Sequence, residues 1–166
     1  MAIPNRQQIA DAIRQLRAEY IHEGLAPSYF EINNGLCDDF AEEVARRLRK
    51  LASCDQEVFT VEGANFYRSQ DDELWDGRLL RNYWKMAPPP QFTWTILNRL
   101  HFGTHIWLVC EKRHYDAECP DGVDNFFDLP IFQRTLITHL REQGINCPDV
   151  ETEDVVPAPR CPVIVT

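Results

Sequence analysis

The chain has 166 residues, of which 44% are hydrophobic and 26% are charged, which is typical of a globular protein with one substantial core. Its formal net charge of −9 argues against nucleic acid and anionic membrane surfaces as partners, because both are themselves negatively charged. The sequence contains neither a run of about eighteen apolar residues nor the apolar region of a signal peptide. We therefore expect a single domain over residues 1–166 that is soluble and cytoplasmic.

Six cysteines are spread along the chain without a Cys-x-x-Cys pair or a regular spacing. A chain of this size does not depend on disulfides for its core, so we expect reduced thiols, although an even number also permits disulfides. The six are Cys37, Cys54, Cys110, Cys119, Cys147 and Cys161.

The N-terminal half predicts two amphipathic helices. Apolar residues recur every three or four positions over residues 5–21, with Asn5 as a possible N-cap and Gly24 as a stop. Residues 25–34 are expected to form a connecting loop. A second helix is predicted over residues 37–51. Its apolar face consists of Cys37, Phe40, Ala41, Val44, Leu48 and Leu51.

The middle of the chain is less regular. Residues 57–61 are rich in β-forming side chains and predict a short strand. Residues 63–91 end in three prolines and predict an irregular or partly helical insertion. The aromatic side chains of this insertion either wall a substrate cleft or seal a small core. Residues 92–97 are expected to form a further strand.

A β-hairpin is predicted after the insertion. Residues 105–110 are apolar on both faces of a strand, which is typical of a central position in a sheet. A polar turn at residues 111–113 leads to a returning strand over residues 114–118, and residues 119–124 form a loop. His114 lies beside the turn and is expected to be exposed.

A third helix is predicted from residues 129–130 to a stop at Gly144, with Asp128 as its cap and a proline at an early helical position. Residues 147–166 contain four prolines and are expected to form an extended C-terminal tail. A short edge strand at residues 163–165 is a possible end of this tail.

Cys37 has the sequence context of a nucleophile. The dipeptide Asn34-Gly35 predicts a tight turn, because both residues tolerate positive φ, and a helix starts directly after it. Unpaired N–H groups and the positive end of the helix dipole favour a thiolate at such a position. Asp38 and Asp39 oppose this effect, since a neighbouring negative charge raises the pKa of a thiol. Activation therefore depends mainly on a base.

His105 and Asp116 are the candidates for that base and for the acid that orients it. His105 begins the central strand, and Asp116 lies on the returning strand. A two-residue turn at residues 110–111 places Asp116 opposite His105, whereas a turn at residues 111–112 places Glu118 there. Glu118 is therefore the second candidate for the orienting acid.

Catalysis by a thiol also needs hydrogen-bond donors to the oxyanion that forms. The backbone N–H of Cys37 is a natural donor to an oxyanion, and Asn33, Asn34 or a tryptophan could provide a second donor. A zinc site would need His101 and His105 with Cys110 or Cys119. We expect neither a metal nor a cofactor, because Gly103 interrupts a helical pair of histidines and no paired cysteines are present.

Three stretches resemble transglutaminase-like proteins within the broader papain-like fold. They are Asn34-Gly35-Leu36-Cys37-Asp38-Asp39-Phe40-Ala41, His105-Ile106-Trp107-Leu108-Val109 and Tyr115-Asp116. The resemblance implies an α+β fold with N-terminal helices and a central buried helix packed on a small antiparallel sheet. It also implies that Cys37 is the nucleophile, His105 the base and Asp116 the orienting acid.

These observations lead to two hypotheses about function. The favoured one is a cysteine-dependent hydrolase or acyl transferase, of the protease, isopeptidase or deamidase type, that acts on an amide bond through a thioester. Its partner would be a protein, a peptide or an amide-containing small molecule. The alternative is a non-catalytic protein-binding module or inhibitor on the same fold, because a fold does not by itself determine function.

Overall fold

The computed structural model describes residues 4–52, 59–65, 87–97, 99–100, 102–150 and 152, and for residues 52, 59–65 and 104 it describes the backbone only. Several predictions from the sequence fall elsewhere. His101, most of the insertion at residues 66–86 and the edge strand at residues 163–165 lie outside the described residues.

The first predicted helix is confirmed as α1 (Arg6–His22). The Asn5 side chain accepts a hydrogen bond from the Gln8 N–H, and the Gln8 side chain accepts one from the Asn5 N–H, so the N-terminus has a complete capping box. Gly24, with φ of 72°, follows its C-terminal end.

The predicted loop before Cys37 is wrong in its second half, because α2 (Tyr29–Gly35) occupies it. The Ser28 side chain accepts a hydrogen bond from the Glu31 N–H, and Ser-x-x-Glu is the sequence pattern of a helix start. Gly35 belongs to this helix and is not among the residues with positive φ, so the expected Asn-Gly turn is absent. Leu36, with φ of −130°, separates α2 from the next helix.

The second predicted helix is confirmed as α3 (Cys37–Ala52), which begins at the cysteine. Four of its expected apolar positions are buried, namely Phe40, Ala41, Val44 and Leu48. Leu51 was also placed on this face, but its side chain is 63% exposed because it lies in the last turn of the helix.

Three strands form one antiparallel sheet in the order β1-β2-β3: β1 (Phe59–Asn65), β2 (Thr104–Cys110) and β3 (Arg113–Tyr115). The prediction of a central strand is confirmed by β2. β3 is shorter than predicted, since it ends at Tyr115. Glu111 and Lys112 both have positive φ, 48° and 65°, and form the two-residue turn between β2 and β3.

The C-terminal half differs from the predictions in two places, one of them a predicted strand and the other the cap of a predicted helix. The strand expected at residues 92–97 is instead the short helix α5 (Trp94–Leu97), at whose start the Thr93 hydroxyl accepts a hydrogen bond from the Ile96 N–H. The predicted third helix is confirmed as α6 (Pro130–Glu142) with proline in its first turn. Asp128 does not cap it, because that residue ends the 3₁₀ helix η3 (Phe126–Asp128).

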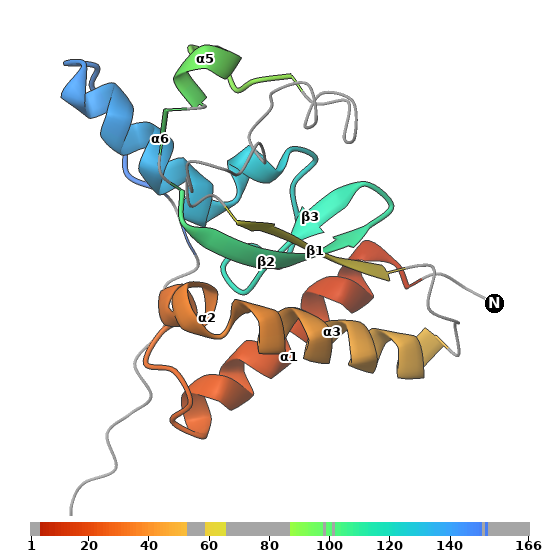
Figure 1. Cartoon of the computed structure of the whole chain (residues 1–166). Helices are drawn as coiled ribbons and strands as arrows, with labels where there is room; N and C mark the ends of the chain where they lie inside the picture. Colours follow the sequence, from red (N-terminus) through yellow and green to blue (C-terminus); the bar gives the residue numbers. More distant parts are fainter. Residues whose placement is uncertain are drawn as a thin grey trace, which may run out of the picture.

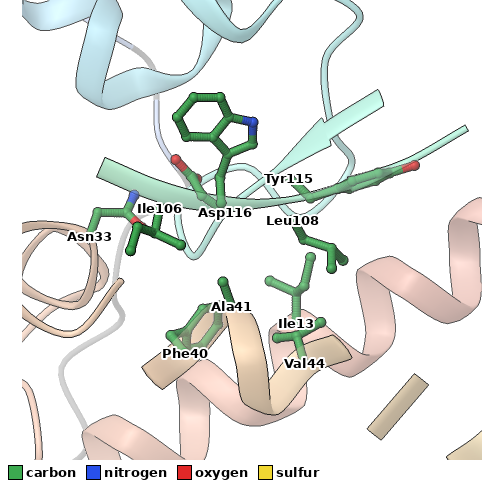
Figure 2. A pocket seen from close by; sticks show the side chains of 10 residues that line it. Ile13, Asn33, Phe40, Ala41, Val44, Ile106, Leu108, Tyr115 and Asp116 are labelled. Atoms are coloured by element: carbon green, nitrogen blue, oxygen red, sulfur yellow. The ribbon is translucent and has the colours of Figure 1, made fainter. Parts of the chain in front are cut away.

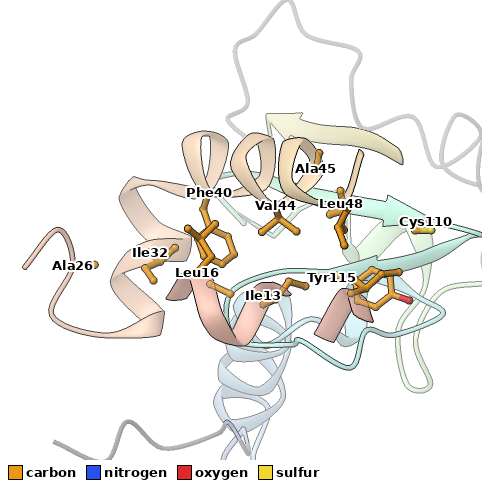
Figure 3. Packing of buried hydrophobic residues seen from close by; sticks show 13 residues of the cluster. Ile13, Leu16, Ala26, Ile32, Phe40, Val44, Ala45, Leu48, Cys110 and Tyr115 are labelled. Atoms are coloured by element: carbon orange, nitrogen blue, oxygen red, sulfur yellow. The ribbon is translucent and has the colours of Figure 1, made fainter. Parts of the chain in front are cut away.

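The sheet lies between two groups of helices, with α1, α2 and α3 on one side and α5 and α6 on the other (Figure 1). Leu108 of β2 joins the core formed with α1 and α3, which Figure 3 shows, whereas Trp107 joins the second core with η3 and α6. The fold is therefore α+β, with β2 covered on both faces. Among the described helices none is long and apolar enough to cross a membrane.

The loop after β3 depends on a glycine at position 122. Gly122 has φ of 69°, and a Cβ atom there would lie 2.4 Å from the ring of Tyr115, which is buried. Gly144 has a similar φ of 79° but nothing within 4 Å, so it is a matched control.

We predict that Gly122→Ala lowers the free energy of unfolding by about 2–4 kcal/mol, because it adds a steric clash to the cost of positive φ. Gly144→Ala should cost only about 1 kcal/mol for the backbone conformation. Denaturant titrations followed by circular dichroism measure both values. Equal losses for the two variants would contradict the close packing of Gly122 on Tyr115.

Candidate active site

The three residues singled out from the sequence lie together at one end of the sheet. His105 is the second residue of β2 and is completely buried. Its Nε2 atom lies 3.1 Å from the Oδ2 atom of Asp116, a residue that is also buried. Cys37 is half-buried at the start of α3, and its thiol interacts with the His105 ring. Residues far apart in the sequence thus form one continuous polar group.

Asp116 reaches His105 because the chain leaves the β-ladder after Tyr115. The pairing of Cys110 with Arg113, continued along the strands, would place Glu118 opposite His105. Instead, the Oδ1 atom of Asp116 accepts hydrogen bonds from the N–H groups of Glu118 at 3.0 Å and Cys119 at 2.9 Å. This turn ends β3 and directs the other carboxylate oxygen, Oδ2, to the imidazole.

The pKa of the Cys37 thiol lies below its ordinary value. Burial alone would raise the pKa, and the charge of Asp38 acts in the same direction. Hydrogen bonding to the His105 side chain and to the Ile106 backbone, together with the charge of His105, outweighs both effects. The thiolate is therefore stabilised by β2 and not by the helix start alone.

The pKa of His105 shifts in the opposite direction, to about 9. Burial favours the neutral ring, but hydrogen bonds with Asp116 and Cys37 and the negative charges of both residues favour the imidazolium more strongly. Because the pKa of the thiol falls while that of the imidazole rises, a thiolate and an imidazolium coexist between the two values.

The two nitrogens of the His105 ring have different environments. Nε2 is paired with Asp116, whereas Nδ1 is buried and forms no well-aligned hydrogen bond with a described residue. Nδ1 is thus the atom left to exchange a proton with the Cys37 thiol, through a contact that is still loose. Such contacts often tighten only when a substrate binds.

Trp107 supports the His105 ring from one side. The two rings are stacked with centroids 5.8 Å apart and planes inclined by 22°. The Trp107 Nε1–H donates to Nδ1 of His114 at 2.8 Å, and burial lowers the pKa of His114 to about 4, so His114 is a neutral acceptor. The expectation that His114 is exposed is therefore wrong. Because its N–H is already bonded, Trp107 is a poor candidate for the second oxyanion donor.

The two asparagines considered as oxyanion donors also have other roles. Asn33 is buried, and its amide donates to Glu118 at 3.0 Å and accepts from the Ala117 N–H at 3.3 Å. Asn34 is exposed and donates to the Phe30 carbonyl at 2.8 Å. The backbone N–H of Cys37 remains the clearest donor, since the first N–H groups of a helix have no acceptor within that helix.

Glu118, the second candidate for the orienting acid, is buried but faces away from this role. Its carboxylate accepts two hydrogen bonds from the Arg134 guanidinium on α6, one of them at 2.9 Å, as well as the bond from Asn33. The sequence gives no sign of this ion pair, because it depends on where α6 packs. Asp116 is the carboxylate that contacts His105.

One ligand of the zinc site considered from the sequence, His101, lies outside the described residues. No group of three or more potential ligands from His, Cys, Asp and Glu comes together in the part of the chain that the structure describes. His105 and Cys110 lie near opposite ends of β2, and five residues of a strand span about 16 Å. Of the six cysteines, the four with described positions are free: Cys37, Cys110, Cys119 and Cys147.

A small cavity lies between α3 and β2, next to Asp116. Its volume is about 10 Å³, which is room for about one water molecule. The side chains of Ile13, Phe40 and Val44 face β2 across it (Figure 2). This cavity is a packing gap beneath the site and is too small to hold a substrate.

No protein-family model matches the chain, and neither a curated protein nor a solved structure matches it. The grounds for a function are therefore the geometry and electrostatics of the site itself.

We predict that iodoacetamide at pH 7 alkylates Cys37 at least about tenfold faster than Cys110 and Cys119, because the thiolate is the reactive form. Burial is the main cause that raises the pKa of these two thiols, to about 11 and about 12. Peptide mass spectrometry after timed quenching measures the rates. The same protein in denaturant is the control, in which the three should react similarly. Equal rates in the folded protein would contradict an activated Cys37.

Proposed function

We propose that this chain is a cysteine-dependent hydrolase or acyl transferase with a papain-like, transglutaminase-like fold. Cys37 is the nucleophile, His105 the general base and acid, and Asp116 the residue that orients the imidazole. The observation that carries the proposal is the His105 ring, which bonds Asp116 through Nε2 and interacts with the Cys37 thiol. This is the arrangement that nucleophilic catalysis by a thiol requires.

In the reaction, the Cys37 thiolate attacks the carbonyl carbon of an amide and forms a tetrahedral oxyanion, to which the Cys37 N–H donates a hydrogen bond. The His105 imidazolium transfers its Nδ1 proton to the leaving nitrogen, the C–N bond breaks, and a thioester remains. Water or a second amine then attacks the thioester, and neutral His105 takes a proton from this attacking molecule. The C–S bond breaks, and the Cys37 thiolate and the His105 imidazolium are restored.

Asp116 contributes by fixing the proton distribution on the imidazole. Its carboxylate accepts from Nε2–H, so the proton that moves during the reaction is the one on Nδ1, next to the sulfur. The carboxylate also compensates for burying a positive ring, which burial alone would make neutral.

The fold supports the same reading. The helix that begins with Cys37 packs on an antiparallel sheet, and the central strand of that sheet carries His105. The substrate class that suits this chemistry is an amide, peptide or isopeptide bond, or a glutamine side chain. A protease, an isopeptidase, a deamidase and an acyl transferase differ only in the nitrogen that leaves and the nucleophile that resolves the thioester. A non-catalytic binding module would need no lowered thiol pKa, so the electrostatics of Cys37 favour the enzyme.

The experiment that tests this proposal is acylation by p-nitrophenyl acetate, an ester with a good leaving group. The wild-type chain should release a burst of p-nitrophenolate equal to the number of active sites and carry an acetyl group on Cys37. Cys37→Ala should lose the burst, whereas Cys147→Ala, which removes a half-buried thiol outside the site, should keep it.

His105→Ala should acylate slowly and then accumulate acetyl-Cys37, because deacylation loses its base, with a total effect of about 10²–10⁴-fold on turnover.

With amide substrates the rate should rise as the pH passes the lowered pKa of Cys37 and fall as it passes about 9, where His105 loses the proton for the leaving amine. A chain that acetylates Cys37 no faster than Cys147 would support the binding module instead.

A further inference from the structure

Two residues of the turn that follows β3, Ala117 and Glu118, are held by three different helices. The Ala117 carbonyl accepts from Nη1 of Arg17 on α1 at 2.9 Å, and the Ala117 N–H donates to Asn33 on α2. The Glu118 carboxylate binds Asn33 and the guanidinium of Arg134 on α6. Polar contacts from three helices thus converge on one short turn, and this turn carries Asp116.

The Glu118 side chain is the centre of these contacts. It is 3% exposed, so its charge is stable there only with a partner. Arg134 provides a two-pronged hydrogen bond from a planar group, which fixes direction as well as charge. Arg134 itself lies over the Phe30 ring of α2, 4.6 Å from its centroid. The Glu118 side chain is therefore held from several directions.

Fixing Glu118 also fixes Asp116. The backbone N–H of Glu118 donates to Oδ1 of Asp116, and this bond directs the other oxygen to His105. A Glu118 that moves would move its own N–H, and the Asp116 carboxylate would lose one of the two bonds that set its direction. The contact between Arg134 and Glu118 thus reaches the imidazole through two hydrogen bonds.

Asn33 connects the same network to the nucleophile. It lies four residues before Cys37, in the helix that ends directly before α3. A single buried amide therefore joins the segment that presents the thiol to the turn that presents the acid.

We propose that Asn33, Glu118 and Arg134 are positioning residues that set the direction of the Asp116 carboxylate and thereby the charge state of His105 and Cys37. The inference rests on the proposed function, because it concerns how Cys37, His105 and Asp116 are held. None of the positioning residues contacts the reacting atoms.

The test is the pH dependence of Cys37 alkylation by iodoacetamide in the full chain, which gives the apparent pKa of the thiol. In Arg134→Met this pKa should rise by about one unit towards that of an ordinary thiol, because a misdirected Asp116 supports the imidazolium less well. Arg141→Met is the matched control: Arg141 lies on the same helix as Arg134 and forms an exposed ion pair with Asp149, so its loss should leave the pKa of Cys37 unchanged.

Two further variants keep the test decisive if Arg134→Met does not fold. Glu118→Gln keeps the shape of the side chain but removes the negative charge that pairs with Arg134. It should therefore raise the pKa of Cys37. Arg134→Lys keeps the charge without the planar fork and should give a smaller rise than Arg134→Met. Thermal unfolding of each variant separates a loss of stability from a change in the thiol.

The positioning role would be overturned if the variants of Arg134 and Glu118 lowered the melting temperature but left the apparent pKa of Cys37 unchanged. The proposed function would remain intact in that case, provided that His105→Asn raises the pKa of Cys37. A wild-type Cys37 with an ordinary pKa that His105→Asn does not alter would instead overturn the proposed function. The two failures are therefore distinguishable.

Discussion

The structure of this site depends on one buried hydrogen bond, between Nε2 of His105 and Oδ2 of Asp116. An imidazole that is removed from water prefers to be neutral, and a neutral ring would give little stabilisation to a thiolate. The carboxylate reverses that preference and raises the pKa of His105, which in turn lowers the pKa of Cys37. The charge of Asp38 opposes the thiolate, whereas the hydrogen bond with His105 and the charge of its ring favour it.

Two features of the fold hold His105 and Asp116 in place, namely the turn after β3 and the core that packs on the His105 ring. β3 ends after three residues, and the turn that replaces its continuation is folded around the Asp116 carboxylate. On the opposite side of the sheet from α3, the second core packs Trp107 and Phe132 against the His105 ring and keeps water from it. The short antiparallel sheet thus has a double role: it closes two hydrophobic cores, and it places the His105 imidazole where α3 begins.

Much of this arrangement could be predicted from local sequence, and the remainder depends on contacts between distant residues. The Asn5 cap, the central strand and the helix beginning at Cys37 follow from capping chemistry and hydrophobic periodicity, which are local. The helix α2 was missed because Pro27 and two aromatics favoured a loop, although Ser28 and Glu31 fit a helix start. The choice between Asp116 and Glu118 could not be made from strand register, because the strand ends before either residue. The partnership of Glu118 with Arg134 depends on how α6 packs, which no local pattern encodes.

The most direct test of the central claim is a ¹⁵N nuclear magnetic resonance titration of the histidine rings. His105 should carry protons on both ring nitrogens at pH 7 and lose one only near its raised pKa of about 9, and Cys37→Ala should lower that pKa by removing the thiolate. His114 provides an internal reference, since it should be neutral throughout this range. A His105 ring that is neutral at pH 7, and whose pKa is the same with and without the Cys37 thiol, would contradict the account.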